Sequence, residues 1–221
     1  MRKVALVLLF ALLVSGCHHG GVLNQIKGSG KRELQKRDVS PFTAISTEGA
    51  FTIELTCQKN LSLEVEGDDN ILPMVKAEVS NNVLRLSNNG NYSVSEPVKF
   101  KISVPNLEAL TVSGAGKIDI KGMNNDKFEI DADGAPTINV SGTTKLVDIH
   151  SNGAGKINTN SLNAARAVVN SNGATQVEVD VKEQLDVTVN GPSSVTYKGD
   201  PVVNKNVNGP GKVERRASEG A

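Results

Sequence analysis

The side chains with the greatest potential for chemistry are few and scattered. His150 is the only histidine beyond residue 19, and Asp148 stands two positions before it. A serine-type triad needs a histidine within hydrogen-bond reach of a nucleophile, and no serine stands out as that partner. A solvated histidine beside a carboxylate is therefore the preferred interpretation of this pair.

Glu129 and Asp148 form a second candidate group. Each stands five positions before a recurring glycine, Gly134 or Gly153, so that stacking of the repeats would make the two carboxylates neighbours. A pair of carboxyl groups about 5 Å apart is the arrangement of a retaining glycosidase. A catalytic cleft needs walls, however, and the links between the repeats are only a few residues long. We therefore expect exposed charges on a strand face and no catalytic residues.

Composition excludes several other classes. The 24 Lys and Arg residues balance 24 Asp and Glu residues, which argues against a nucleic-acid binder. Aromatic residues make up 3% and Trp is absent, so stacking platforms for sugars or bases are disfavoured. Zinc needs three or four convergent ligands, and the adjacent His18 and His19 do not supply them. We expect neither a metal nor a cofactor.

The N-terminal residues carry an export signal. Arg2 and Lys3 precede an apolar run of 11 residues, Val4 to Val14, which is too short to span a hydrocarbon core of about 30 Å. The segment that follows, Val14-Ser15-Gly16-Cys17, resembles a bacterial lipobox. The resemblance implies that residues 1–16 are a signal peptide and that Cys17 carries the lipid. An ordinary secretory signal followed by a chance cysteine is the alternative.

Lipidation would have consequences for the next segment. His18, rather than Asp, follows the cysteine, and in a Gram-negative cell the general sorting rule then favours the outer membrane. Residues 17–40 are predicted to be a flexible lipidated tether, because Gly20-Gly21 and Gly28-Ser29-Gly30 interrupt any apolar period. This basic segment would be either a solvated linker or a contact to anionic headgroups. Cys57 then lacks a disulfide partner and is interpreted as a small buried hydrophobe.

A repeat occupies most of the remaining chain. Glycines recur at intervals of 18 to 20 residues, at Gly114, Gly134, Gly153, Gly173, Gly191 and Gly209. Four positions after these glycines stand the apolar residues Ile118, Ile138, Ile157, Val177, Val195 and Val213. The next positions are polar, and alternation with a period of two is typical of strands. Stacked units would align the apolar positions in columns, which predicts a β-solenoid.

The residues that precede the glycines predict a further feature. Asn152, Asn172, Asn190 and Asn208 recur at this position. Asn-Gly makes tight turns and tolerates left-handed backbone, and stacking at about 4.8 Å would let the amides form a ladder along one corner.

The two ends of the repeat differ. Residues 56–105 break the period but contain alternating runs such as Val98 to Val104, which predicts antiparallel strands that cap the stack. At the other end Lys205 and Arg215 replace apolar column residues. We therefore predict an all-β, single-stranded parallel and right-handed β-helix over residues 41–216, with a small antiparallel cap near its N-terminal end. It comprises a first coil at 42–55, capping strands at 56–105, repeat coils at 106–216 and a disordered tail at 217–221.

Several short motifs resemble a known family. They are Phe42-Thr43-Ala44-Ile45, Val65-Glu66-Gly67-Asp68-Asp69-Asn70-Ile71-Leu72, Asn82-Val83-Leu84-Arg85-Leu86 and Val104-Pro105-Asn106-Leu107, followed by the Ser-Gly-Ala repeats. In this order they resemble the head GIN domain family of auto-transporter adhesins over residues 41–215. The resemblance implies a β-helical domain of exported bacterial proteins, many of them lipoproteins. It implies no catalytic residues.

The sequence therefore favours a noncatalytic envelope lipoprotein, held at the membrane by its lipid anchor. Its solenoid would bind or space an envelope polymer or a protein partner, through ligand-binding residues that the sequence does not identify. The alternatives are a polysaccharide-active enzyme and a purely structural envelope protein. Solenoid ends and edges can pair between chains, which leaves a homo-oligomer open.

Overall fold

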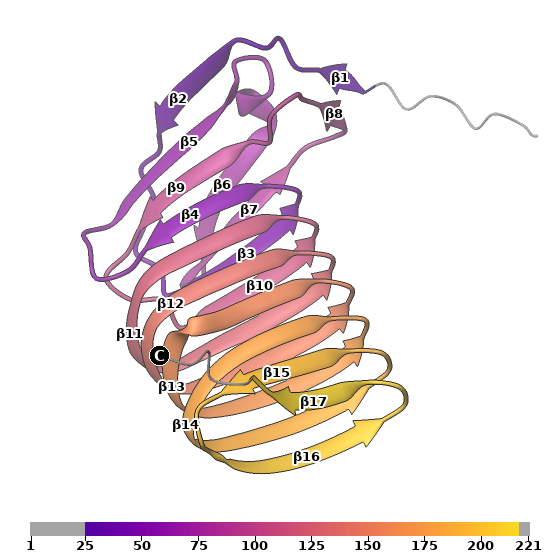
Figure 1. The fold of residues 1–221 in the computed structure, drawn as a ribbon. Coiled ribbons are helices and arrows are strands. Elements are labelled where there is room, and N and C mark those ends of the chain that lie inside the picture. Colours follow the sequence, from indigo (N-terminus) through magenta and orange to yellow (C-terminus); the bar gives the residue numbers. More distant parts are fainter. Residues whose placement is uncertain (1–24, 217–221) are drawn as a thin grey trace, which may run out of the picture.

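The computed structural model of the protein describes residues 25–216. They form a stack of β-strands wound into a solenoid, and the described part contains no α-helix, only the 3-10 turn η1 (Leu72–Met74) (Figure 1). The predicted all-β solenoid is thus confirmed. The predicted signal peptide, Cys17 and the tail at 217–221 lie outside the described residues.

The repeat coils have the register that the glycines predicted. Their strands are β10 (Ala109–Gly114), β11 (Lys117–Gly134), β12 (Thr137–Gly153), β13 (Lys156–Gly173) and β14 (Gln176–Asn190). Successive strands pair in parallel, so that Gly114, Gly134, Gly153 and Gly173 stack in one column. The links expected between coils, such as residues 121–125, are bulged continuations of the strands, because the register shifts there and Gly122 has a φ of 71°.

Apolar columns fill the interior. Ile118, Ile138 and Ile157 align with one another on successive coils and are almost completely buried. The intervening Asn139 and Asn158 lie on the outer side of the same sheet and are half-buried. This alternation is the expected consequence of a strand period of two.

The first coil in the sequence is not the first coil of the stack. It consists of β3 (Ala44–Gly49) and β4 (Thr52–Thr56). β3 lies between β10 and β7 (Val83–Asn88), and β4 lies between β11 and β9 (Lys99–Ser103). The chain thus places the β7–β9 coil on one side of this coil before it returns to build the repeat on the other.

The N-terminal end of the stack is capped, as predicted. β5 (Ser62–Asp68) is antiparallel to β9, and β6 (Val75–Ser80) is antiparallel to β7. The expectation that all strands of residues 56–105 are antiparallel cap strands is wrong for β7 and β9, which run parallel to the stack. Their apolar residues continue the core columns: Leu84 pairs with Ile45, and Phe100 pairs with Ile53.

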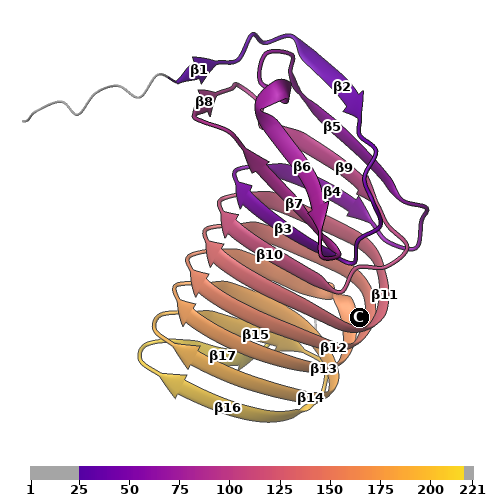
Figure 2. The same cartoon turned by 180° about the vertical axis from the view of Figure 1, so that it is seen from behind.

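Residues 25–37, which we call the strap, are also folded onto the cap (Figure 2). β1 (Ile26–Lys27) pairs with β8 (Tyr92–Ser93), and β2 (Arg32–Lys36) pairs with β5. The prediction of a flexible tether over residues 17–40 is therefore wrong for this part. Gly28 is there a packing requirement, because a Cβ at this position would lie 2.1 Å from the Asp68 carboxylate.

The C-terminal end of the stack is open. It consists of β15 (Ser194–Lys198), β16 (Val202–Asn208) and β17 (Lys212–Arg215). Within the described residues β16 pairs only with β14, and β17 only with β15. Lys205 and Arg215 are exposed, which confirms the predicted polar end of the core columns. Among residues 25–216 we find no helix of the length and apolarity needed to cross a membrane.

Candidate functional site

The predicted asparagine ladder is present and runs along the corner of the solenoid. Asn172 Nδ2 donates to Asn152 Oδ1 at 2.9 Å, Asn190 Nδ2 to Asn172 Oδ1 at 2.7 Å and Asn208 Nδ2 to Asn190 Oδ1 at 2.9 Å. Asn152 Nδ2 donates in turn to Asp133 Oδ1 at 3.1 Å. All five side chains are exposed. We call Asp133, Asn152, Asn172, Asn190 and Asn208 the ladder corner.

The glycines, not the asparagines, provide the left-handed backbone of this corner. The φ angles are 105° at Gly134 and 133° at Gly173, whereas no ladder residue has a positive φ. A Cβ at Gly134 would lie 2.5 Å from the carbonyl oxygen of Gly114, so a larger residue would force the coils apart. The asparagines therefore contribute through their side chains rather than through their tolerance of left-handed conformations.

Buried hydroxyl groups make the ladder corner rigid from the inside. The hydroxyls of Ser151 and Thr175 are 2.8 Å apart, and Ser171 Oγ donates to Ser193 Oγ at 2.8 Å. Ser193 Oγ also donates to the carbonyl oxygen of Gly173. These groups satisfy one another, so they support the turn and leave no donor free for a ligand. No sequence pattern predicted this network.

The ladder leaves hydrogen-bonding capacity at the surface. Each internal asparagine uses one of its two N–H groups and one oxygen lone pair within the ladder. The other N–H and lone pair remain available, and they recur on each coil at about 4.8 Å. The corner can therefore offer a row of equivalent donors and acceptors to an extended partner.

The carboxylates that suggested a glycosidase belong to an ion-pair cluster. Glu129 and Asp148 are neighbours on β11 and β12, as predicted. Lys127 Nζ lies 2.9 Å from Glu129 and 3.6 Å from Asp148, and the hydrogen bond to Glu129 raises the pKa of Lys127. His150 Nε2 lies 3.1 Å from Asp148. Both carboxylates thus have cationic or imidazole partners, which makes structural charge pairing the simpler role.

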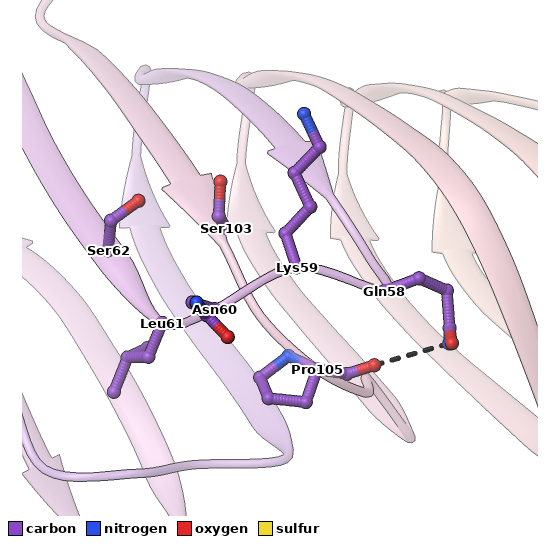
Figure 3. Close-up of a pocket in the computed structure, with 7 residues that line it drawn as sticks. All are labelled: Gln58, Lys59, Asn60, Leu61, Ser62, Ser103 and Pro105. Carbon is purple, nitrogen blue, oxygen red and sulfur yellow. Dashed lines mark hydrogen bonds between the residues drawn. The ribbon is translucent and has the colours of Figure 1, made fainter.

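A hollow of about 740 Å³ lies where the connection between β4 and β5 passes the end of β9 (Figure 3). It is lined by Gln58, Lys59, Asn60, Leu61, Ser62, Ser103 and Pro105. Gln58 has a φ of 62°, and its amide donates to the carbonyl oxygen of Pro105 at 3.2 Å. No sequence pattern predicted this hollow, because its walls come from two distant connections.

A neighbouring hollow of about 670 Å³ contains Asn106, Glu108, Asn125 and Asp126 in its lining. The oxygens Asn106 Oδ1 and Asn125 Oδ1 are buried and have no hydrogen-bond partner among the described residues. They are acceptors that a donor of a ligand could satisfy. Within residues 25–216, however, no three His, Cys, Asp or Glu residues are grouped as metal ligands would be.

Cys57 is buried, as predicted, and burial raises the pKa of its thiol to about 11. The thiolate is the nucleophilic form of cysteine. Cys57 is therefore protonated at neutral pH and acts as a small apolar side chain of the core.

Comparisons with solved structures show the same fold. A putative adhesin from Bacteroides fragilis is 24% identical, with a TM-score of 0.70, and the match covers 86% of this chain and all of that one. A putative adhesin from Parabacteroides distasonis is 21% identical, with a TM-score of 0.50, over 87% of this chain and all of that one. No match was found among curated proteins.

The family comparison is more specific. The model of the family described as "Putative auto-transporter adhesin, head GIN domain" matches residues 41–201. This range contains the motifs and all but the last part of the repeat that carried the resemblance over residues 41–215, and it covers well over half of the 221 residues. The chain belongs to this head GIN domain family.

Proposed function

We propose that this protein is a noncatalytic, lipid-anchored component of the bacterial envelope, whose solenoid displays the ladder corner for binding a linear envelope polymer. The single observation that carries the proposal is the row of exposed amides at Asn152, Asn172, Asn190 and Asn208, which are joined by hydrogen bonds of 2.7 to 2.9 Å. A polymer that spans several coils would contact equivalent groups in turn. Individually weak contacts then add within one complex.

The adhesin description of the family supports a location at the cell surface or in the envelope. The lipobox at Val14–Cys17 supports anchoring by lipid, with the outer membrane as the expected destination. Acyl chains contribute about 0.8 kcal/mol for each buried methylene group, so more than one chain gives stable attachment.

Binding is tested with the mature chain carrying Cys17→Ser, which is free of lipid. We expect it to bind a subset of polymers on an array of purified envelope glycans and other envelope polymers. Absence of binding to all of them would contradict the proposal and favour a purely structural role. Release of shortened polymer would instead indicate an enzyme.

Anchoring is tested separately in cells. Cys17→Ser should move the protein from the membrane fraction to the soluble fraction after a carbonate wash, because the sulfur is the proposed attachment point. His18→Ala is a suitable control, since it leaves the cysteine intact and should leave the protein in the membrane fraction. A Cys17→Ser protein that stays in the membrane fraction contradicts lipid anchoring.

A further inference from the structure

The strap is fixed to the capped end of the solenoid by its backbone. The N–H of Gly28 donates to the carbonyl oxygen of Ser93 at 2.8 Å, and the N–H of Gly30 donates to Asp68 Oδ2 at 3.0 Å. Further along, β2 pairs with β5 over its whole length. The strap is therefore part of the folded domain from Ile26 onward.

Side chains reinforce this attachment at both ends of the strap. Asn70 Nδ2 donates to the carbonyl oxygen of Lys27 at 2.9 Å. Arg32 Nε lies 3.3 Å from Glu66 Oε1. Arg37 donates to the carbonyl oxygens of Val75 at 2.7 Å and Leu72 at 3.0 Å. A force applied to the chain N-terminal to residue 25 would therefore act on the cap through the strap.

These contacts also change the interpretation of the basic residues. Lys31 is paired with Glu33 and Asp69, and Arg32 with Glu66, whereas Lys36 is exposed and has only a long contact of 3.9 Å to Glu64. Cations that are paired within the protein have less charge to offer to anionic headgroups. The strap therefore connects the domain to its anchor more than it binds lipid by charge.

The strap leaves only a short connection to the proposed anchor. Seven residues lie between Cys17 and Gln25, and the eight residue-to-residue steps across them reach at most about 28 Å when fully extended. The stack is longer: seven strand spacings lie between β7 and β16, which at about 4.8 Å each make about 34 Å. The connection is thus too short for the open end to face the bilayer with the cap turned away.

The sides of the stack offer little reason for it to lie flat. The large exposed hydrophobic side chains of the described residues are Ile26 and Leu34 on the strap and Val202 and Val207 on β16. All four are at the two ends of the stack. The described side faces therefore carry no large exposed hydrophobic side chain whose transfer from water to lipid would be favourable.

We infer that the capped end faces the membrane and that the solenoid stands away from it, with the ladder corner rising from Asp133 in the middle of the stack to Asn208 at the distal end. This inference rests on the proposed lipid anchor. It deepens the proposed function, because it makes the open end and the upper ladder the parts that meet the partner first. Figures 1 and 2 show β1 beside β8 at one end of the stack and β16 at the other.

The orientation can be measured by energy transfer from single labels to lipids. Ser95→Cys places a fluorophore between β8 and β9 at the capped end, and Asn206→Cys places one on β16. Cys57 is buried and remains unlabelled. The lipidated full-length protein is added to preformed phosphatidylethanolamine and phosphatidylglycerol vesicles that contain an acceptor-labelled lipid. We expect clearly more transfer from residue 95 than from residue 206.

A longer connection provides the matched control. Twenty Gly and Ser residues inserted between Gly21 and Val22 add up to about 70 Å of reach, and the difference between the two labels should then shrink. Lipidated protein with equal transfer from both positions, or more from residue 206, overturns the orientation but leaves the anchor intact. Protein that carries no lipid by mass spectrometry overturns both the anchor and the orientation.

Discussion

The same core columns run to both ends of this solenoid, but further strands cover the columns at the capped end and none covers them at the open end. At the capped end β5 and β6 cover the last parallel coil, and Val65 and Phe100 are completely buried. At the open end Val213 is half-buried and Val207, which continues the column of the buried Val189, is 37% exposed. The repeat alone therefore does not make a core: an apolar column residue is buried only where a further strand covers it.

At the open end a charged residue occupies a core column, whereas at the capped end strands cover the columns. Lys205 occupies the column of Ile149, Val169 and Val187, one coil further on. An inward-pointing cation on an edge strand discourages pairing with a second chain. The contrast suggests that the capped end is stabilised by packing, whereas the open end is protected from association.

The contrast in packing gives the largest expected effect. Phe100→Ala should lower the free energy of unfolding by about 3–5 kcal/mol, because it removes a fully buried ring. This ring packs edge-to-face on the ring of Phe51, with the two ring centroids 5.2 Å apart. Val213→Ala at the open end should cost about 1 kcal/mol or less, as at a partly exposed site. Urea unfolding measures both, and similar costs would contradict the difference between the ends.

Removing side-chain contacts of the strap should give the next largest loss of stability. Arg32→Ala removes contacts to Glu66 and to the carbonyl oxygen of Glu96, at a cost of about 1.5–3 kcal/mol. Amide hydrogen exchange should become faster in residues 32–36. Lys36→Ala is the control, because Lys36 is exposed and its ion pair is long, so exchange should hardly change. Unchanged exchange in Arg32→Ala would show that the strap is held by other contacts.

Removing the cation at the open end should create self-association. Lys205→Val restores an apolar residue to the core column, on the same side of β16 as the half-buried Val203 and the exposed Val207. Light scattering should show the mass rising from that of a monomer toward that of a dimer as concentration increases. Asn206→Val adds the same side chain on the outer side of β16 and should have a smaller effect. A Lys205→Val protein that stays monomeric would refute the protective role.

The smallest expected effect is a loss of stability at low pH, to which a glutamate at each end of the solenoid contributes. At the capped end burial alone would raise the pKa of Glu66, but hydrogen bonds from Arg32 and Lys101 outweigh it and the pKa is lowered. At the open end contacts with Arg216 and Asn160 likewise outweigh burial and lower the pKa of Glu178. Because a lowered pKa means that folding favours the carboxylate, this stabilisation is present above the unfolded value of about 4.3 and is lost as pH falls.

Replacement of these glutamates tests the sign. In urea unfolding from pH 7 to pH 3, Glu66→Gln and Glu178→Gln should each make the decline in stability below about pH 4.3 less steep. Glu48→Gln, at an exposed position without an ion pair among the described residues, is a control that should leave the slope unchanged. A steeper decline in either variant would contradict the direction of these pKa shifts.

The sequence could predict the repeat because every coil reuses the same positions. The spacing of Gly134, Gly153 and Gly173 fixes the register, and with it both the buried Ile157 and the exposed Asn172. The strap could not be predicted in this way. Its β2 residues pair with β5 residues that lie 28 to 36 positions away in the sequence, from Lys36 with Glu64 to Arg32 with Asp68.

The two hollows could not be predicted from the sequence either. Gln58 and Pro105, which meet at the corner of the larger hollow, are 47 residues apart and belong to connections without a repeat. The parallel direction of β7 and β9 was also missed. Alternation in Val83 to Leu86 specifies which side chains face the core, but it carries no information on strand direction.

The proposed binding surface is the ladder corner and not the ion-pair cluster. Its most direct test is the affinity of two variants for the polymer that binds best on the array. The double variant Asn172→Ala with Asn190→Ala should bind at least about tenfold more weakly, a loss of about 1.4 kcal/mol, while Glu129→Gln should bind as the unchanged protein does. Full affinity in the ladder variant would contradict binding at the ladder corner, and weakened binding in Glu129→Gln would place the binding surface at the ion-pair cluster instead.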